Sequence, residues 1–104
     1  MKLIYVCSPC RGVPPFSFIK TAWNIRKARM YCAAVLAAGH IPIAPHYFYR
    51  GLLSDTRPDQ RAKALNTASW LLHACDEVWV FGSIISEGML MEIRLAEGLR
   101  LPIS

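Results

Sequence analysis

Leu3-Ile4-Tyr5-Val6-Cys7 is an uninterrupted apolar run near the start of the chain. A run of this length is typical of a strand buried on both faces, as in a parallel sheet covered by helices. Residues 8–17 follow with three prolines and one glycine, which indicates a loop. We therefore expect a buried strand that ends at Cys7 and opens a loop at its carboxyl end.

Beyond this loop, apolar residues at helical spacing predict a helix over residues 21–38. Gly39 is placed to end that helix in a left-handed conformation. Residues 41–44 predict a short strand, which its proline confines to an edge of the sheet. The expected buried stripe of the helix consists of Ile25, Ala28, Cys32, Val35 and Leu36.

The second half of the chain repeats this alternation. The pattern predicts a helix over 58–74, a strand over 78–81, a helix over 86–99 and a short strand that begins at 102–103. An alternating order predicts a parallel sheet with right-handed crossovers and helices on both faces. We expect one domain over 1–104, an α/β three-layer fold of flavodoxin-like or Rossmann-like type with about four parallel strands.

The composition sets the class of protein and of partner. With 54% hydrophobic and 18% charged residues, the chain is expected to be globular. It has neither an apolar run long enough for a membrane span nor a signal peptide, so we expect a cytoplasmic protein without a membrane partner. The formal charge of +5 favours anionic ligands such as nucleotides. Since no nucleic-acid motif is present, we expect no nucleic-acid polymer as partner.

Cysteine and tryptophan placement adds two smaller expectations. Cys7 and Cys10 form a CxxC, which is compatible with a redox pair or with half a zinc site. A second CxxC or a CxxH is missing and Cys7 lies within a strand, so we predict no metal and no cofactor. The three tryptophans are interpreted as packing residues: Trp23, Trp70 and Trp79.

Glu92 is the most informative position. It lies in the middle of the expected inward stripe of the last helix, among Gly88, Met89, Ala96 and Leu99. Burying a carboxylate is costly unless it is paired. A capping box does not explain it, because with Ser86 as N-cap the reciprocal glutamate belongs at position 89. Two interpretations stay open. One is a buried salt bridge to an arginine, and the other is a functional carboxylate, which either binds the sugar or acts as a nucleophile on its anomeric carbon.

Parallel sheets of this kind bind ligands outside the carboxyl ends of their strands. The segments expected there are 8–12, 45–49 and 82–88. The amides at the start of the last helix form an anion site, where Ser86 is either a phosphate donor or only an N-cap. Arg11 can grip phosphate, or it is a solvated loop residue. The ligand-binding candidates are Ser8, Arg11, Gly12, His46, Ser86, Glu87, Gly88 and Met89.

Taken together, these residues resemble the nucleoside 2-deoxyribosyltransferase-like superfamily, and most closely its short bacterial and phage-encoded members. The resemblance covers nearly the whole chain. The matching segments are Tyr5-x-Cys7-x-x-x-Arg11-Gly12, Asn24-Ile25 with Ala28-Arg29, Gly39-His40-Ile41-Pro42-Ile43-Ala44-Pro45-His46, Cys75-Asp76-Glu77-Val78-Trp79-Val80-Phe81-Gly82, and Ser86-Glu87-Gly88-Met89 followed by Glu92-Ile93.

The resemblance implies an activity and a set of roles. Enzymes of the superfamily cleave or exchange the N-glycosidic bond of deoxynucleosides or their 5′-monophosphates. Glu92 matches their nucleophile, Tyr5 belongs to their amino-terminal motif and is expected to orient the sugar, and Ser86 matches a serine that contacts the 5′-phosphate. A homo-oligomer is also implied, because these enzymes complete their sites with a neighbouring subunit.

Two positions depart from the superfamily: Cys10, where short relatives often carry tyrosine, and a position in the helix over 58–74 that matters more. Enzymes of the superfamily use an aspartate from the preceding helix, and the matching position here is Ala68. Two hypotheses therefore stand: an N-glycosidase or deoxyribosyltransferase-like enzyme, and a protein that binds or sequesters a nucleotide without turnover, in a phage-defence setting.

Overall fold

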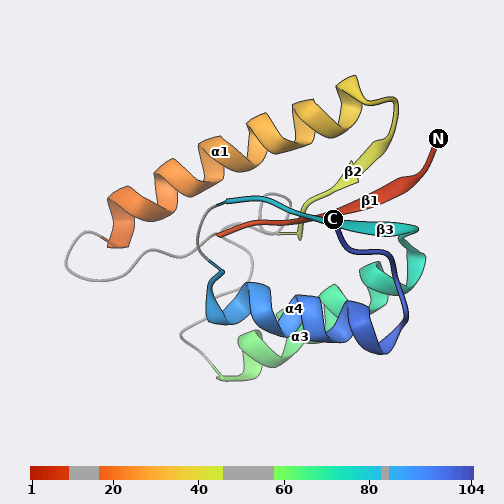
Figure 1. Cartoon of the computed structure of the whole chain (residues 1–104). Coiled ribbons are helices and arrows are strands. Elements are labelled where there is room, and N and C mark those ends of the chain that lie inside the picture. The colour runs from red at the N-terminus through yellow and green to blue at the C-terminus, as the bar shows by residue number, and fades with distance from the viewer. Residues whose placement is uncertain (10–16, 46–57, 83–84) are drawn as a thin grey trace.

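The computed structural model describes residues 1–9, 17–45, 58–82 and 85–104 (Figure 1). Within these ranges strands and helices alternate, as the sequence predicts. The elements are β1 (Leu3–Cys7), α1 (Ser17–Ala37), β2 (Ile41–Ile43), α3 (Pro58–Ala74), β3 (Glu77–Val80) and α4 (Glu87–Gly98). None of the described helices combines the length and apolarity needed to cross a membrane.

The three strands form one parallel sheet in the order β2-β1-β3. Tyr5 at the centre of β1 pairs with Ile43 on one side and with Val78 on the other. The short strand β2, which contains Pro42, lies at the edge, as expected for a strand with a missing donor. The expected parallel α/β architecture is confirmed.

The predicted fourth strand is reduced to an isolated parallel bridge between Val78 and Ile103. The Ser104 amide donates to the Val78 carbonyl at 2.9 Å, and the Val80 amide donates to the Ser104 carbonyl at 2.8 Å. Among the described residues the sheet therefore has three strands where about four were expected, because the chain pairs with β3 at a single residue, Ile103.

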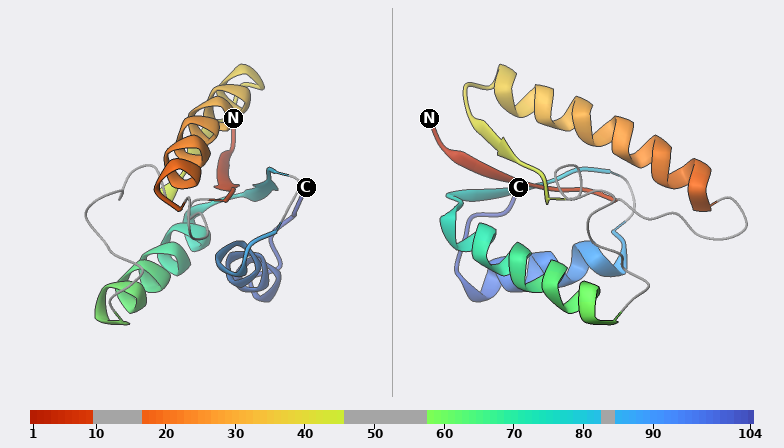
Figure 2. Two further views of the ribbon diagram at one scale, coloured as in Figure 1. Left: turned by 90° about the vertical axis from the view of Figure 1, so that its left-hand side faces the viewer. Right: turned by 180° about the vertical axis from the view of Figure 1, so that it is seen from behind.

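Helices cover both faces of this sheet in three layers. Figure 1 shows α1 on one face and α3 with α4 on the other, and the two views in Figure 2 agree. Side chains alternate along β1, so its residues feed two separate cores. Ile4 and Val6 pack on the α1 side with Val35, whereas Tyr5 and Cys7 pack on the α3–α4 side.

Most boundaries lie close to the predicted ones, with one clear difference. Helix α1 begins at Ser17, four residues before the expected start at Thr21. No proline or glycine lies between Ser17 and Thr21, so nothing in this segment opposes a helix. Gly39 has a φ of 87°, which confirms its expected left-handed role after α1.

Three apolar side chains are more exposed than the sequence led us to expect. Leu36 was placed on the α1 stripe but is 61% exposed, because it is turned by about 100° from the fully buried Val35. Trp23 and Trp70 were interpreted as packing residues, yet they are 52% and 74% exposed. Trp79 packs against the core on the α1 side.

Candidate functional site

Glu92 is buried on the inner side of α4, with only 4% of its surface exposed. Its buried neighbours on the helix are Met89 and Ala96. Gly88, which the predicted stripe also included, is exposed instead. The inward face is thus narrower than predicted, and the carboxylate lies near its middle.

The start of α4 excludes a capping role for Glu92. Ser86 has extended backbone angles and is the N-cap, and the Met89 amide donates to its Oγ at 3.3 Å. A capping box requires a glutamate at the position that Met89 occupies. The burial of Glu92 therefore needs another explanation.

That explanation begins with Tyr5. The Tyr5 hydroxyl donates a hydrogen bond to Oε2 of Glu92, and both side chains are buried. The two residues are 87 positions apart in the sequence. They meet because α4 packs against the face of β1 on which Tyr5 lies. A hydrogen bond to a carboxylate is among the stronger ones in proteins, so this contact offsets part of the cost of burying Glu92.

Burial and the neighbouring charge of Glu92 raise the pKa of Tyr5 far above its ordinary value. Both causes disfavour a phenolate next to a carboxylate. Tyr5 therefore keeps its proton at physiological pH and acts as a fixed donor, not as an acid that gives its proton away.

Cys7 lies two residues further along the same face of β1. Its thiol donates to the Met89 carbonyl oxygen at 3.8 Å, which links β1 to the first turn of α4. Burial, and secondly Glu92, raise the pKa of Cys7 to about 12. A protonated thiol is a poor nucleophile, which disfavours the redox reading of the CxxC motif. Its second cysteine, Cys10, lies outside the described residues.

The described part of the chain contains no cluster of side chains suited to bind a metal ion. No three His, Cys, Asp or Glu side chains of these residues are placed to share an ion.

Beyond Cys7 and Val80, the carboxyl ends of β1 and β3 stay in contact with each other. The Phe81 amide donates to the Cys7 carbonyl at 2.9 Å. Gly82 has a φ of 97°, and a Cβ added there would lie 3.1 Å from Cδ of Pro9. Ser8, next to Pro9, is almost completely buried. Ser8 is therefore part of the packed strand end and not of an exposed loop.

The amino end of α4 is more open. Ser86 is half-buried, and Glu87 and Gly88 are exposed. A Cβ added at Gly88 would meet nothing within 4 Å, so there is open space beside this residue. The first amides of a helix have no partner within the helix. The anion site predicted from the sequence stays a prediction, and it lies at this exposed end of α4.

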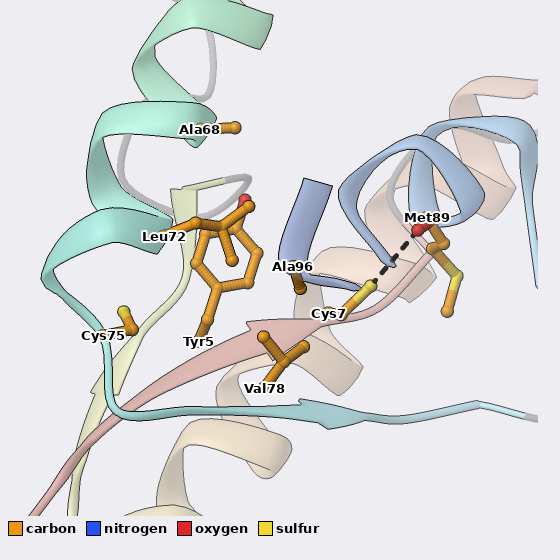
Figure 3. Close-up of a cluster of buried hydrophobic side chains, with 8 residues drawn as sticks. All are labelled: Tyr5, Cys7, Ala68, Leu72, Cys75, Val78, Met89 and Ala96. Atoms are coloured by element: carbon orange, nitrogen blue, oxygen red, sulfur yellow. Dashed lines mark hydrogen bonds between the residues drawn. The ribbon is translucent and has the colours of Figure 1, made fainter. Parts of the chain in front are cut away.

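Tyr5 also belongs to a cluster of buried hydrophobic residues on this face of the sheet. Figure 3 shows side chains of α3 and α4 on either side of the tyrosine ring, with Ala68 and Leu72 coming from α3. Ala68 is 6% exposed and carries only a methyl group where the resemblance leads one to expect an aspartate. On the described α3 face of this core, the second carboxylate of such a site is thus missing.

The structure thus brings together Tyr5, Glu92 and Met89, with Ser86 at the start of the same helix. The predicted ligand residues Arg11, Gly12 and His46 lie outside the described residues. Sequence reasoning missed the direct contact between Tyr5 and Glu92. The available signal was a lone phenol in a buried strand, since a buried hydroxyl needs a hydrogen-bond partner.

Comparisons with known proteins agree with this fold. Among solved structures, the chain is similar to 2-deoxyribosyltransferase from the psychrotolerant bacterium Bacillus psychrosaccharolyticus, with a TM-score of 0.56 and 18% sequence identity. The match covers 97% of this chain and 69% of that one. Likeness at this identity shows a shared fold. No curated protein matches the sequence. The family model described as "Domain of unknown function (DUF7768)" matches residues 2–104, and the chain therefore belongs to that family.

Proposed function

We propose that the protein processes a nucleoside or nucleotide at its N-glycosidic bond, with Glu92 as nucleophile. The observation that carries the proposal is the buried carboxylate held by the Tyr5 hydroxyl. A deoxyribosyltransferase with the same fold supports the choice of ligand. An acid that only stabilised the fold would be an expensive choice here, because an apolar residue of similar size can fill such a position without a desolvation cost.

In the first step a carboxylate oxygen of Glu92 attacks the anomeric carbon of the sugar. The bond between that carbon and the base nitrogen breaks, and the base leaves with the bonding electrons and takes a proton from solvent. The product is a glycosyl ester of Glu92. Tyr5 stays hydrogen-bonded to Oε2 during this step. Because its pKa is raised, it remains a donor while the negative charge of the carboxylate passes to the leaving base.

In the second step water or another base attacks the same carbon and releases the carboxylate. Attack by water makes the protein a hydrolase, whereas attack by a base makes it a transferase. We propose that the amide groups at the start of α4 and the Ser86 hydroxyl hold a 5′-phosphate. The Ser86 oxygen already accepts from the Met89 amide, which leaves the hydroxyl proton to donate.

The test is base release from deoxynucleoside 5′-monophosphates and deoxynucleosides, separated by chromatography. We expect wild type to release free base and Glu92→Gln to be at least about 10³-fold slower, since the nucleophile is gone. Glu97→Gln is the matched control, because Glu97 is an exposed carboxylate on the same helix. No release by wild type, or equal release by Glu92→Gln, contradicts the enzymatic proposal.

A second candidate, binding without turnover, is favoured by one observation. Ala68 is buried beside Tyr5 and has no group that could assist at the sugar or base. In this case nucleotide binds tightly, as calorimetry would measure, and mass spectrometry recovers it intact. If no nucleoside or nucleotide binds to or stabilises the protein, both candidates are wrong.

We also propose that the protein works as a homo-oligomer. One copy leaves Met30 and Trp70 exposed by 69% and 74%, and Leu36 by 61%. Burial of such side chains against another copy is favourable, at roughly 25 cal/mol per Å² of apolar surface. Light scattering coupled to gel filtration measures the mass directly, and a mass equal to one chain at all concentrations contradicts this proposal.

A further inference from the structure

An open hollow lies between α3 and α4, apart from the site around Glu92. Its volume is about 520 Å³. The described residues that line it come from both helices: Leu65, Asn66, Ser69, Met91, Arg94 and Leu95. Neither Tyr5 nor Glu92 is among them. This volume lies within the range of roughly 300–1,000 Å³ that small-molecule sites occupy.

The lining is mostly apolar, with one charge. Of the described residues that form it, Arg94 alone is ionised, and it makes no ion pair within the described part of the chain. The side chains of Asn66 and Ser69 lie in the same lining and are likewise not hydrogen-bonded to other described residues. An apolar hollow with a few polar groups is the usual composition of a small-molecule site.

These features indicate which class of small molecule would bind in the hollow. A guanidinium forms paired, charge-assisted hydrogen bonds with carboxylate, sulfonate or phosphate oxygens. Leu65, Met91 and Leu95 offer apolar surface beside it. We propose that this hollow binds a small amphipathic anion, with its acidic group on Arg94 and its apolar body against these three residues. The proposal is independent of the proposed function, because it concerns other residues and is tested by binding alone.

Two fluorescent probes of nearly the same shape test this site. 8-Anilinonaphthalene-1-sulfonate carries an acidic group, and N-phenyl-1-naphthylamine is its neutral counterpart. We expect Arg94→Gln to weaken binding of the sulfonate about tenfold, because a hydrogen bond to a charged group is lost. The same variant should bind the neutral probe as wild type does.

Arg29→Gln provides the matched control. Arg29 is an exposed arginine on α1, on the opposite face of the sheet, and its replacement changes the net charge equally. We expect this variant to bind both probes as wild type does. Leu65→Trp should weaken both probes, because the larger side chain fills the hollow while Arg94 is kept.

Three outcomes overturn the proposal. One is an equal loss of sulfonate binding in Arg94→Gln and Arg29→Gln, which indicates general charge attraction. Another is unchanged sulfonate binding in both Arg94→Gln and Leu65→Trp. The third is an oligomer that dissociates in Arg94→Gln, which shows that a second copy covers the hollow. Circular dichroism of each variant confirms that the comparison is made between folded proteins.

Discussion

The two faces of the sheet differ in what they bury. On the α1 side, Ile4 and Val6 pack with Val35 in a core made of apolar and aromatic groups. On the α3–α4 side, Tyr5 meets the carboxylate of Glu92. Neighbouring residues of β1 thus have different surroundings, although both sets are buried. Both faces contribute stability through apolar burial, but the second also carries the cost of a buried acid, which we attribute to function.

The largest effect on stability is expected on the α1 face. Ile4 is completely buried, so Ile4→Ala removes apolar contacts and leaves a cavity. We expect the free energy of unfolding to fall by about 2–5 kcal/mol, measured by urea denaturation. Base release per folded molecule should stay unchanged. If Ile4→Ala lost activity but not stability, the proposal that the α1 face does not take part in the reaction would be wrong.

Tyr5→Phe addresses the opposite face. It keeps the ring and removes only the hydroxyl that donates to Glu92. Because the carboxylate loses a partner while staying buried, we expect a loss of about 1–3 kcal/mol in the free energy of unfolding at pH 7. Base release should fall as well, unlike in Ile4→Ala. If Tyr5→Phe equals wild type in both measurements, the contact does not support the site.

Alkaline pH provides a test on Cys7. Its folded pKa is raised to about 12 from an ordinary value of 9.0, so between these values the unfolded chain binds fewer protons than the folded one. Stability therefore falls as pH rises through this window, by up to about 1.4 kcal/mol per pH unit for one such group. Cys7→Ala should show a shallower decline in urea denaturation between pH 9 and pH 11. Parallel curves for the two proteins would show that Cys7 is not shielded from solvent.

The smallest expected effect concerns the strand ends that border the site. Gly82→Ala places a Cβ near Pro9 at a left-handed backbone position, so we expect a loss of about 1–2 kcal/mol in the free energy of unfolding. Gly98→Ala is the control: Gly98 lies at the end of α4, with nothing within 4 Å of the added Cβ. The control should be neutral or stabilising. Equal losses would mean that the close approach of Gly82 and Pro9 is unimportant.

Much of the fold could be predicted because its signals are local. The apolar run of β1, the range 58–74 of α3 and the cap at Ser86 are all found where they were expected. The rotation of the helices about their axes was predicted less well. Leu36 and Gly88 were assigned to buried stripes and are exposed. An apolar stripe shows roughly which side of a helix faces the core, but the stripe is broad. Tertiary packing decides which of its residues are buried.

The candidate site shows the same limit. The position of Glu92 among apolar residues was enough to single it out, because an acid in an inward stripe needs a reason. A phenol in a buried strand indicates that Tyr5 needs a hydrogen-bond partner, but the sequence does not say that this partner is Glu92. The hollow beside Arg94 was equally invisible, since it arises from the gap that two packed helices leave between their side chains.

By itself the sequence determined the order of the elements, the edge position of β2 and the presence of one acid on an inward helix face. These follow from uninterrupted apolar runs, from the helical periodicity of 3.6 residues and from the missing donor of proline, which all act over short stretches of chain. Only the tertiary structure decided that Tyr5 meets Glu92 across 87 positions. Such a contact depends on how β1 and α4 are oriented against each other, and that orientation is set by the packing of the whole core.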